Sequence, residues 1–197
     1  MITRRKFSQY ALAGLATYSL PRIAHTAKNL KPILREDGTY TQSWFLESFL
    51  NLKDDLAESH ESGKRLAIMW EQLGCSYCRD THLINFALPK IRDFVEQHFN
   101  IIQVDIHGMR DVIDFDGTTL SEKKHAQKNH VRFTPTIQFF PETPDEVGNK
   151  SGKAAEILRM PGYLKPKSFL ALFQFVQEKS YEQTKLKPYL KSKLLNS

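Results

Sequence analysis

Hydrophobic residues along the chain change from helical spacing to short unbroken runs and back. The first helical set has spacings of four, three and four residues, with polar residues between them: Phe45, Phe49, Leu52 and Leu56. This pattern predicts a helix that packs along one side and ends at Ser62-Gly63. The apolar run over residues 65–70 then predicts a buried strand, and residues 101–106 predict a second strand.

Two further helices are predicted between these strands, over residues 76–86 and 90–99. Pro89 divides them, because its ring disfavours helical backbone at Leu88. The resulting order is helix, strand, helix, strand. A helical connection between two strands implies a right-handed crossover and parallel pairing of the strands.

Residues 107–130 resemble an insertion before the last strands. The acidic segment 114–117 looks like the start of a calcium loop, but the ligands that follow in an EF-hand are missing, so a turn is expected. Thr119-Leu120-Ser121-Glu122 has the spacing of a capping box. It predicts a helix that runs toward Asn129.

The last third of the chain predicts a hairpin and a closing helix. Residues 133–140 and 155–160 are the expected strands, and the polar loop 141–152, which contains Pro and Gly, joins them. The closing helix is expected over residues 165–183, where four hydrophobic residues share one side: Phe169, Leu170, Phe173 and Val176.

Length and composition indicate one domain. The chain has 197 residues, of which 41% are hydrophobic, and this is enough for one ordinary core. We expect a connector with a short edge strand over residues 28–40, the domain over 41–184 and a basic C-terminal tail over 185–197. The net charge of +6 comes partly from the leader. We expect no nucleic-acid partner, and we expect the domain to act as a monomer.

The first 27 residues predict an export signal. Thr3-Arg4-Arg5-Lys6-Phe7 precedes an apolar run over residues 10–20 that is short for a membrane span. The paired arginines, with a hydroxyl residue before them and Phe after them, resemble a twin-arginine signal. The alternatives are an ordinary secretory signal and a retained N-terminal anchor, since Ala24-His25-Thr26-Ala27 only approximates a cleavage site. We therefore expect a periplasmic protein.

Cys75 and Cys78 are the only cysteines of the sequence and carry the expected chemistry. The loop between them is too short for a useful structural staple, because closing it removes little unfolded-state entropy. If Cys75 lies in the first helical turn, free backbone N–H groups and the helix dipole stabilise its thiolate. Cys75 would open a substrate disulfide, and Cys78 would resolve the mixed disulfide. Arg79 and His82 lie close by and could add positive potential.

Metal binding is the main alternative for this pair. Two cysteines are too few for a four-cysteine zinc site, and a copper site would need a further ligand such as His82 or Met69. A C-x-x-C pair between a strand and a helix favours redox chemistry. We therefore expect no metal and no cofactor besides the redox-active pair. The other histidines do not cluster and are expected to be non-functional: His25, His60, His98, His107, His125 and His130.

A second functional element is expected at Phe133-Thr134-Pro135-Thr136. A proline within an apolar strand is costly unless its fixed φ and missing N–H serve a purpose. A cis bond before Pro135 would be such a purpose, because it would expose the backbone of Thr134 for strand-like pairing with a peptide. A trans proline at a strand edge fits these residues equally well.

Three motifs together resemble the thioredoxin superfamily, most closely the SoxW-type periplasmic thioredoxins: Gly74-Cys75-Ser76-Tyr77-Cys78, Val131-Arg132-Phe133-Thr134-Pro135-Thr136-Ile137 and Pro161-Gly162-Tyr163. The similarity covers residues 43–179. It implies an α/β thioredoxin-like fold with a central mixed sheet flanked by helices, to which the helical insertion over residues 107–130 is added before the proline strand. It also implies Cys75 as nucleophile, Cys78 as resolving thiol and Pro135 in cis.

The site departs from thioredoxins proper at one position. They carry a buried aspartate six residues before the first cysteine, where this chain has Met69. Glu71 is the nearest carboxylate and is expected to deprotonate Cys78, and a rim position without contacts is the alternative. Substrate contacts are expected from Thr134, Pro135, Tyr77 and Trp70, with packing in the core as the alternative for Trp70.

Together these features predict an extracytoplasmic thiol–disulfide oxidoreductase. The resemblance points to a reductase of disulfides in exported proteins, in sulfur oxidation or redox-protein maturation, with a membrane thiol transporter as electron donor. The direction of electron flow depends on the potential of the pair against its compartment. A disulfide oxidase or isomerase and a copper metallochaperone are therefore the alternatives.

Overall fold

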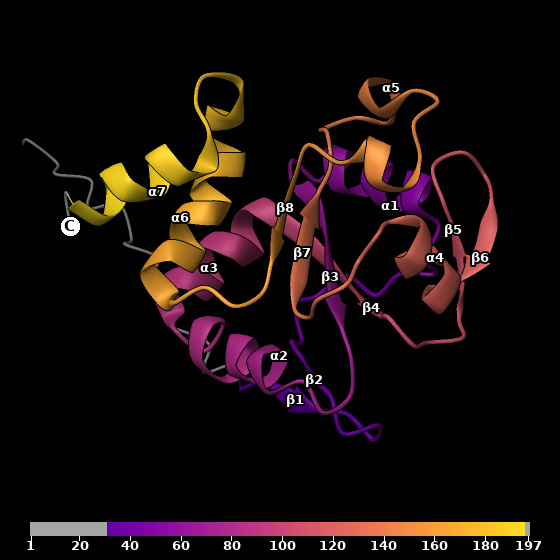
Figure 1. Cartoon of the computed structure of the whole chain (residues 1–197), viewed down its shortest axis with the longest axis horizontal. Coiled ribbons are helices and arrows are strands. Elements are labelled where there is room, and N and C mark those ends of the chain that lie inside the picture. Colours follow the sequence, from indigo (N-terminus) through magenta and orange to yellow (C-terminus); the bar gives the residue numbers. More distant parts are fainter. Residues whose placement is uncertain (1–30, 196–197) are drawn as a thin grey trace, which may run out of the picture.

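The structure, a computed structural model, describes residues 31–195 and contains one four-stranded mixed sheet (Figure 1). The strands are β3 (Arg65–Glu71), β4 (Phe99–Asp105), β7 (Thr136–Phe139) and β8 (Leu158–Pro161), in the order β4-β3-β7-β8. β3 is parallel to β4 and antiparallel to β7, and β7 is antiparallel to β8. The predicted parallel pair and the predicted hairpin are confirmed.

Helices cover both faces of this sheet. In Figure 1, α3 (Pro89–His98) and α6 (Pro166–Gln177) lie on one side of the strands, and α1 (Leu52–Glu61) and α4 (Glu122–Lys128) lie on the other. The α/β class with helices flanking a mixed sheet is therefore confirmed.

Side chains of β3 alternate between two hydrophobic cores. Ala67 and Met69 belong to the core beneath α3 and α6, whereas Leu66 and Trp70 belong to the core beneath α1 and α4. All four side chains are completely buried. Because successive strand residues point to opposite faces, Glu71 at the end of β3 points to the same face as Met69.

Short elements complete the part of the chain that the structure describes. Two antiparallel hairpins consist of β1 (Ile33–Leu34) with β2 (Tyr40–Thr41), and β5 (Asp111–Ile113) with β6 (Thr119–Ser121). The remaining helical segments are α2 (Ser76–Asp80), the π-turn η1 (Thr81–Asn85), α5 (Pro144–Val147), η2 (Gly152–Ala155), η3 (Ser180–Glu182) and α7 (Leu186–Leu195).

The first helix begins later than the hydrophobic spacing predicts. Helix α1 starts after Phe49, whose side chain is 100% exposed. The Ser48 hydroxyl donates to the Asp55 carboxylate over 2.7 Å and accepts the backbone N–H of Leu50 over 2.6 Å. These local bonds compete with helical hydrogen bonds before α1. The predicted helical turn from Phe45 is therefore wrong.

The insertion folds as a hairpin followed by a helix. Thr119 opens β6, so the predicted capping by this residue is wrong. Ser121 caps α4 instead, and its hydroxyl accepts the backbone N–H of Lys124. The acidic segment 114–117 is a turn, as predicted, in which Gly117 N–H donates to the carbonyl of Asp114 over 2.8 Å.

The C-terminal segment is more ordered than a tail. Helix α6 ends before Lys179, which has a left-handed φ of 53°. Helix α7 then folds back, and its Tyr189 packs edge-on against Phe175 with ring centroids 5.0 Å apart. Most of the segment expected as a basic tail, residues 185–197, is thus a helix docked on α6.

The predicted export signal, residues 1–27, lies outside the described residues. The described part of the connector forms β1 and the turn into β2, with Ile33 opposite Thr41. Within residues 31–195, no helix has the length and apolar character needed to cross a membrane.

Candidate active site

Cys75 and Cys78 form a disulfide at the start of the helix that follows β3. Cys75 is the N-cap of α2, and its Sγ accepts the backbone N–H of Cys78 over 3.1 Å. Gly74 has a φ of 78°, a left-handed backbone that favours glycine, and it turns the chain from β3 into α2. Helix α2 continues directly into η1, so the helix predicted over residues 76–86 is present, with a π-turn in its second half.

The two sulfur atoms lie in different environments. Cys78 is 4% exposed, whereas Cys75 is half-buried. The N–H group at the open end of the helix points at Cys75 Sγ and would stabilise negative charge there. Cys75 is therefore the sulfur that an incoming protein disulfide can reach, whereas Cys78 is shielded from such a substrate.

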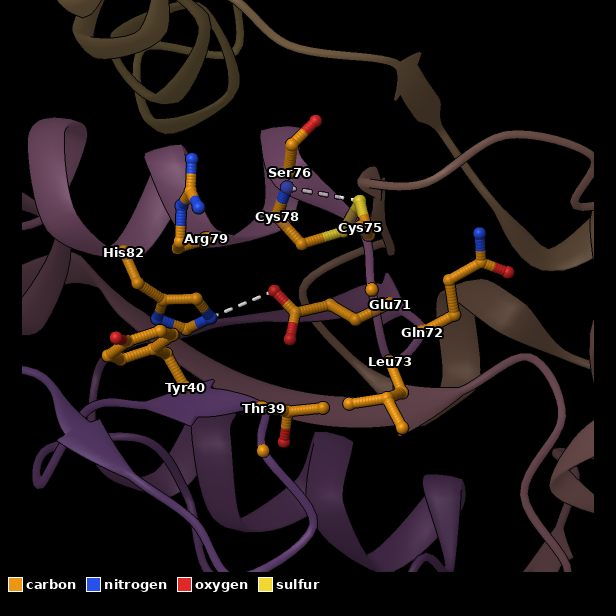
Figure 2. A pocket seen from close by; sticks show the side chains of 12 residues that line it. Thr39, Tyr40, Glu71, Gln72, Leu73, Cys75, Ser76, Cys78, Arg79 and His82 are labelled. Carbon is orange, nitrogen blue, oxygen red and sulfur yellow. Dashed lines mark hydrogen bonds and ion pairs between the residues drawn. A yellow bond between two sulfur atoms is a disulfide. The ribbon is translucent and has the colours of Figure 1, made fainter.

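A cavity of about 270 Å³ lies beside the disulfide (Figure 2). The β1–β2 hairpin, the end of β3 and the start of α2 and η1 supply its walls, which include Thr39, Tyr40, Glu71, Cys75, Cys78 and His82. In Figure 2 the Glu71 carboxylate points toward the His82 ring, with the disulfide alongside. The hairpin of the connector thus closes the site on one side.

Glu71 is buried within this wall rather than placed at the rim. Its side chain is 3% exposed, and its Oε1 lies 2.8 Å from His82 Nε2. Its Oε2 accepts a hydrogen bond from Gln103 Nε2 on β4, and the same amide group donates to the carbonyl of Tyr40. Glu71 therefore belongs to a hydrogen-bonded network that borders the disulfide.

The sequence suggests His82 as a source of positive potential or as a copper ligand, whereas the structure places it in this network. Its side chain is 1% exposed, and its Nδ1 lies 3.1 Å from Gln42 Nε2. A signal was available, because His82 follows Cys78 by four residues and so lies on the same face of the helix. Gln42 has no comparable signal, since it lies in a loop distant in sequence from the cysteines.

Thr134 and Pro135 lie near the end of β3 from which the chain continues to the cysteines. The bond between them is cis, and Thr136 pairs with Trp70 in the β3–β7 register. The carbonyl of Pro135 accepts the backbone N–H of Gly162 over 2.7 Å. Within residues 31–195, neither backbone group of Thr134 makes a hydrogen bond. A free backbone edge is therefore present beside the loop that leads to the cysteines.

Tyr77 and Trp70, both predicted to contact substrate, lie in opposite environments. Tyr77 is 57% exposed and stacks on Tyr163, with ring centroids 5.6 Å apart. Trp70 is completely buried, and its Nε1 donates to Gln138 Oε1 over 2.9 Å. Because Trp70 cannot reach a docked substrate, its prediction as a substrate contact is corrected to a role in the core.

The acidic turn carries a structural ion pair. The buried Asp114 carboxylate accepts hydrogen bonds from Lys128 Nζ over 2.8 Å and from the Gly152 N–H over 3.0 Å. His125, also buried, stacks on Trp70, and burial lowers its pKa. In the described part of the chain, no group of three or more His, Cys, Asp or Glu side chains is placed to hold a metal ion.

The chain is similar to known proteins with a thioredoxin-like domain or fold. A family model described as a thioredoxin-like domain matches residues 52–177. A thioredoxin-fold protein from Helicobacter pylori is 25% identical, with a TM-score of 0.52 over 68% of this chain and 87% of that one. A thioredoxin from Thermus thermophilus is 18% identical, with a TM-score of 0.47 over 64% and 83% of the two chains. A search among curated protein sequences found no significant match.

Proposed function

Because the chain belongs to the family of thioredoxin-like domains, we propose that it is a thiol–disulfide oxidoreductase that reduces disulfides in exported proteins. The observation that carries this proposal is the Cys75–Cys78 disulfide, placed where the helix begins after β3. One sulfur is accessible and the other is buried, which is the asymmetry that a two-step exchange needs.

In the reducing direction, the dithiol form of the protein reacts first through Cys75. Its thiolate attacks one sulfur of the substrate disulfide, the substrate S–S bond breaks, and the released substrate thiolate takes up a proton. Cys78 then gives its proton to Glu71 and attacks Cys75 Sγ. The second substrate thiolate leaves, and the Cys75–Cys78 disulfide remains. Two electrons have moved from the protein to the substrate, and an external dithiol must restore them.

The free backbone edge at Thr134 supports a peptide substrate. An extended segment that contains the substrate cystine can pair with this edge as an added strand, next to the cis bond at Pro135. Tyr77, exposed beside Cys75, supplies an apolar contact for the same segment. Backbone pairing tolerates many side chains, which suits a reductase of several partners.

The cellular setting is part of the proposal. The paired Arg4 and Arg5 support export by a twin-arginine route to the periplasm, with cleavage or retention of the leader. In that compartment a membrane thiol transporter is the proposed electron donor. The SoxW-type resemblance supports partners in sulfur oxidation or redox-protein maturation. We propose that the domain acts as a monomer, without nucleic acid, metal or bound cofactor.

The experiment measures reduction of a model disulfide protein by the purified chain, with dithiothreitol as electron donor. The wild-type protein is expected to accelerate the reaction, Cys75→Ser to abolish it, and Cys78→Ser to accumulate mixed disulfides. Full activity of Cys75→Ser would overturn the mechanism. Tight stoichiometric copper binding without turnover would favour a metallochaperone, and net formation of substrate disulfides or their rearrangement would favour an oxidase or isomerase.

A further inference from the structure

Glu71 borders two separate cavities. One is the cavity of about 270 Å³ beside the disulfide, and the other is a polar cavity of about 210 Å³ on the far side, toward the end of β4. Thr39 and Gln72 also border both cavities. Of these three side chains only that of Glu71 carries an acidic group, a carboxylate that can accept a proton. Glu71 is thus placed to pass a proton from one cavity to the other.

Hydrogen bonds around His82 fix the side on which its ring proton lies. The amide nitrogen of Gln42 is 3.1 Å from His82 Nδ1 and 3.5 Å from the His82 carbonyl oxygen. An amide nitrogen donates to both acceptors, whereas an amide oxygen would face the carbonyl unfavourably. Nδ1 is therefore an acceptor, the proton lies on Nε2, and Nε2–H donates to Glu71 Oε1 over 2.8 Å.

We propose that His82 is a positioning residue for Glu71, and that the pair forms a proton path from Cys78 to the polar outer cavity. This inference rests on the proposed function and deepens it. The Nε2–H of His82 holds one carboxylate oxygen and Gln103 holds the other, so the carboxylate keeps one orientation. The proton that Cys78 loses during resolution passes to Glu71 and then to water on the far side.

The helix geometry supports this role. His82 lies in the π-turn η1, which directly follows the cysteine-bearing α2. Single π-turns inside helices occur often at functional sites, because they reorient side chains that a regular helix would place elsewhere. The ring of His82 lines the wall of the disulfide cavity.

Several charged or titratable groups face the two cavities and contribute to the pH dependence of the reaction. Tyr40 and Arg79 lie beside the disulfide, and the outer cavity is lined by Arg35, Asp37, Asp105, Arg110 and Glu122. Arg110 and Glu122 form an ion pair of 2.6 Å. A hydrogen bond from Thr39 holds the pKa of Asp37 below its usual range. The outer cavity therefore holds charges of both signs around the exit of the path.

The proton path matters only where Cys78 needs help to lose its proton. An ordinary thiol has a pKa of about 8.5, so at about pH 9 solvent can remove the proton without a relay. At about pH 6 the reaction depends on an internal base. Loss of the relay should therefore slow the reaction at low pH and have little effect at high pH.

Two amide variants of His82 separate this role from a purely structural one. His82→Gln places an amide donor near the position of Nε2, whereas His82→Asn reaches only the position of Nδ1 and leaves Glu71 without its partner. We expect His82→Asn to lower the rate of substrate reduction about 10-fold at about pH 6 and less than about 2-fold at about pH 9. His82→Gln should stay within about 2-fold of wild type at both pH values.

His125→Asn is the matched control, because His125 is equally buried but stacks on Trp70, whose side chain lies in the core on the opposite face of the sheet. It should lower thermal stability without changing the pH profile. A second readout is the rate of alkylation of Cys78 against pH in a Cys75→Ser background. There His82→Asn should slow alkylation about 10-fold at about pH 6, and His82→Gln should not.

Equal losses for His82→Asn and His82→Gln, or a loss that is the same at both pH values, would overturn the proton path. A changed pH profile of the reduction rate in His125→Asn would also overturn the proton path. A wild-type protein that does not reduce disulfides at all would instead contradict the proposed function. The two failures are therefore distinguishable in one set of measurements.

Discussion

The ring of Tyr77, which stands between the two cysteines in sequence, lies parallel to the ring of Tyr163 within 15°, with centroids 5.6 Å apart. Tyr163 follows Gly162, whose N–H donates to the carbonyl of Pro135. This stack ties the cysteine-bearing helix to the loop after β8. Three segments that are distant in sequence therefore meet at one rim of the proposed substrate site.

Tyr163→Ala should weaken substrate binding more than it slows chemistry. Without its partner, Tyr77 loses its fixed position beside Cys75, and an aromatic pair of this kind contributes about 0.5–1.5 kcal/mol. We expect KM for a disulfide-containing protein to rise about 2- to 10-fold with kcat within about 2-fold. Steady-state kinetics check this. Tyr163→Phe keeps the stack and serves as the control, and an equal rise of KM in this variant would contradict the role of stacking.

Asp55 makes stability depend on pH in a defined direction. Burial raises its pKa from 3.8 to about 6, although the hydrogen bond from Ser48 acts in the opposite direction. The folded protein therefore retains this proton to a higher pH than the unfolded chain does. Its stabilising contribution is complete below about pH 4 and is lost as the pH rises through about 6.

Asp55→Asn removes this ionisation while its amide oxygen can still accept the Ser48 hydroxyl. We expect the free energy of unfolding at about pH 8 to increase by roughly 1–2 kcal/mol, with no gain at about pH 4. Urea titrations at both pH values measure the difference. Asp54→Asn, at the exposed neighbouring position, is the control and should show no such pH dependence. A gain of equal size at both pH values would contradict the assignment.

Phe45 and Phe49 test the observed start of α1. Phe45 is 9% exposed and packs edge-on against Phe86 with centroids 5.5 Å apart, whereas Phe49 is fully exposed. Phe45→Ala should lower the free energy of unfolding by roughly 3–4 kcal/mol, and Phe49→Ala should change it by less than about 0.5 kcal/mol. Denaturant unfolding measures both values. Similar losses for the two variants would support the continuous helix predicted from the sequence.

Tyr189 tests whether α7 belongs to the folded domain. Its ring packs on Phe175, and its hydroxyl donates to Glu178 over 2.7 Å. Tyr189→Ala should cost roughly 2–3 kcal/mol of unfolding free energy and raise the rate of amide exchange in α7. Hydrogen exchange resolved by residue measures this. Tyr189→Phe should lose only the hydroxyl contact, and unchanged exchange in Tyr189→Ala would show that α7 is not held by this residue.

Much of the fold could be predicted because local pattern and tertiary structure agree in it. The apolar run over residues 66–70 became the centre of β3, which is buried on both faces, and Phe169, Phe173 and Val176 of the predicted stripe are buried in α6. The pattern fails around Phe49, because a Ser48 side-chain bond replaces helical backbone bonds there. Periodicity does not report such local competition.

The active site, like the fold, could be predicted from the sequence only in part. Cys75 and Cys78 could be located from sequence because their spacing and context are specific. The sequence does not determine that Glu71 is buried, because a residue at the end of a strand can face either solvent or the core. The contact between His82 and Gln42 depends on a π-turn and on the return of a distant loop. Neither feature has a sequence signal of its own.

The equilibrium reduction potential of the Cys75–Cys78 pair, measured against glutathione or dithiothreitol, tests the central claim most directly. A reductase of exported proteins should have a potential near that of thioredoxin, on the order of −270 mV. A potential on the order of −120 mV, at which the dithiol form is favoured and the protein acts as an oxidant, would contradict the account.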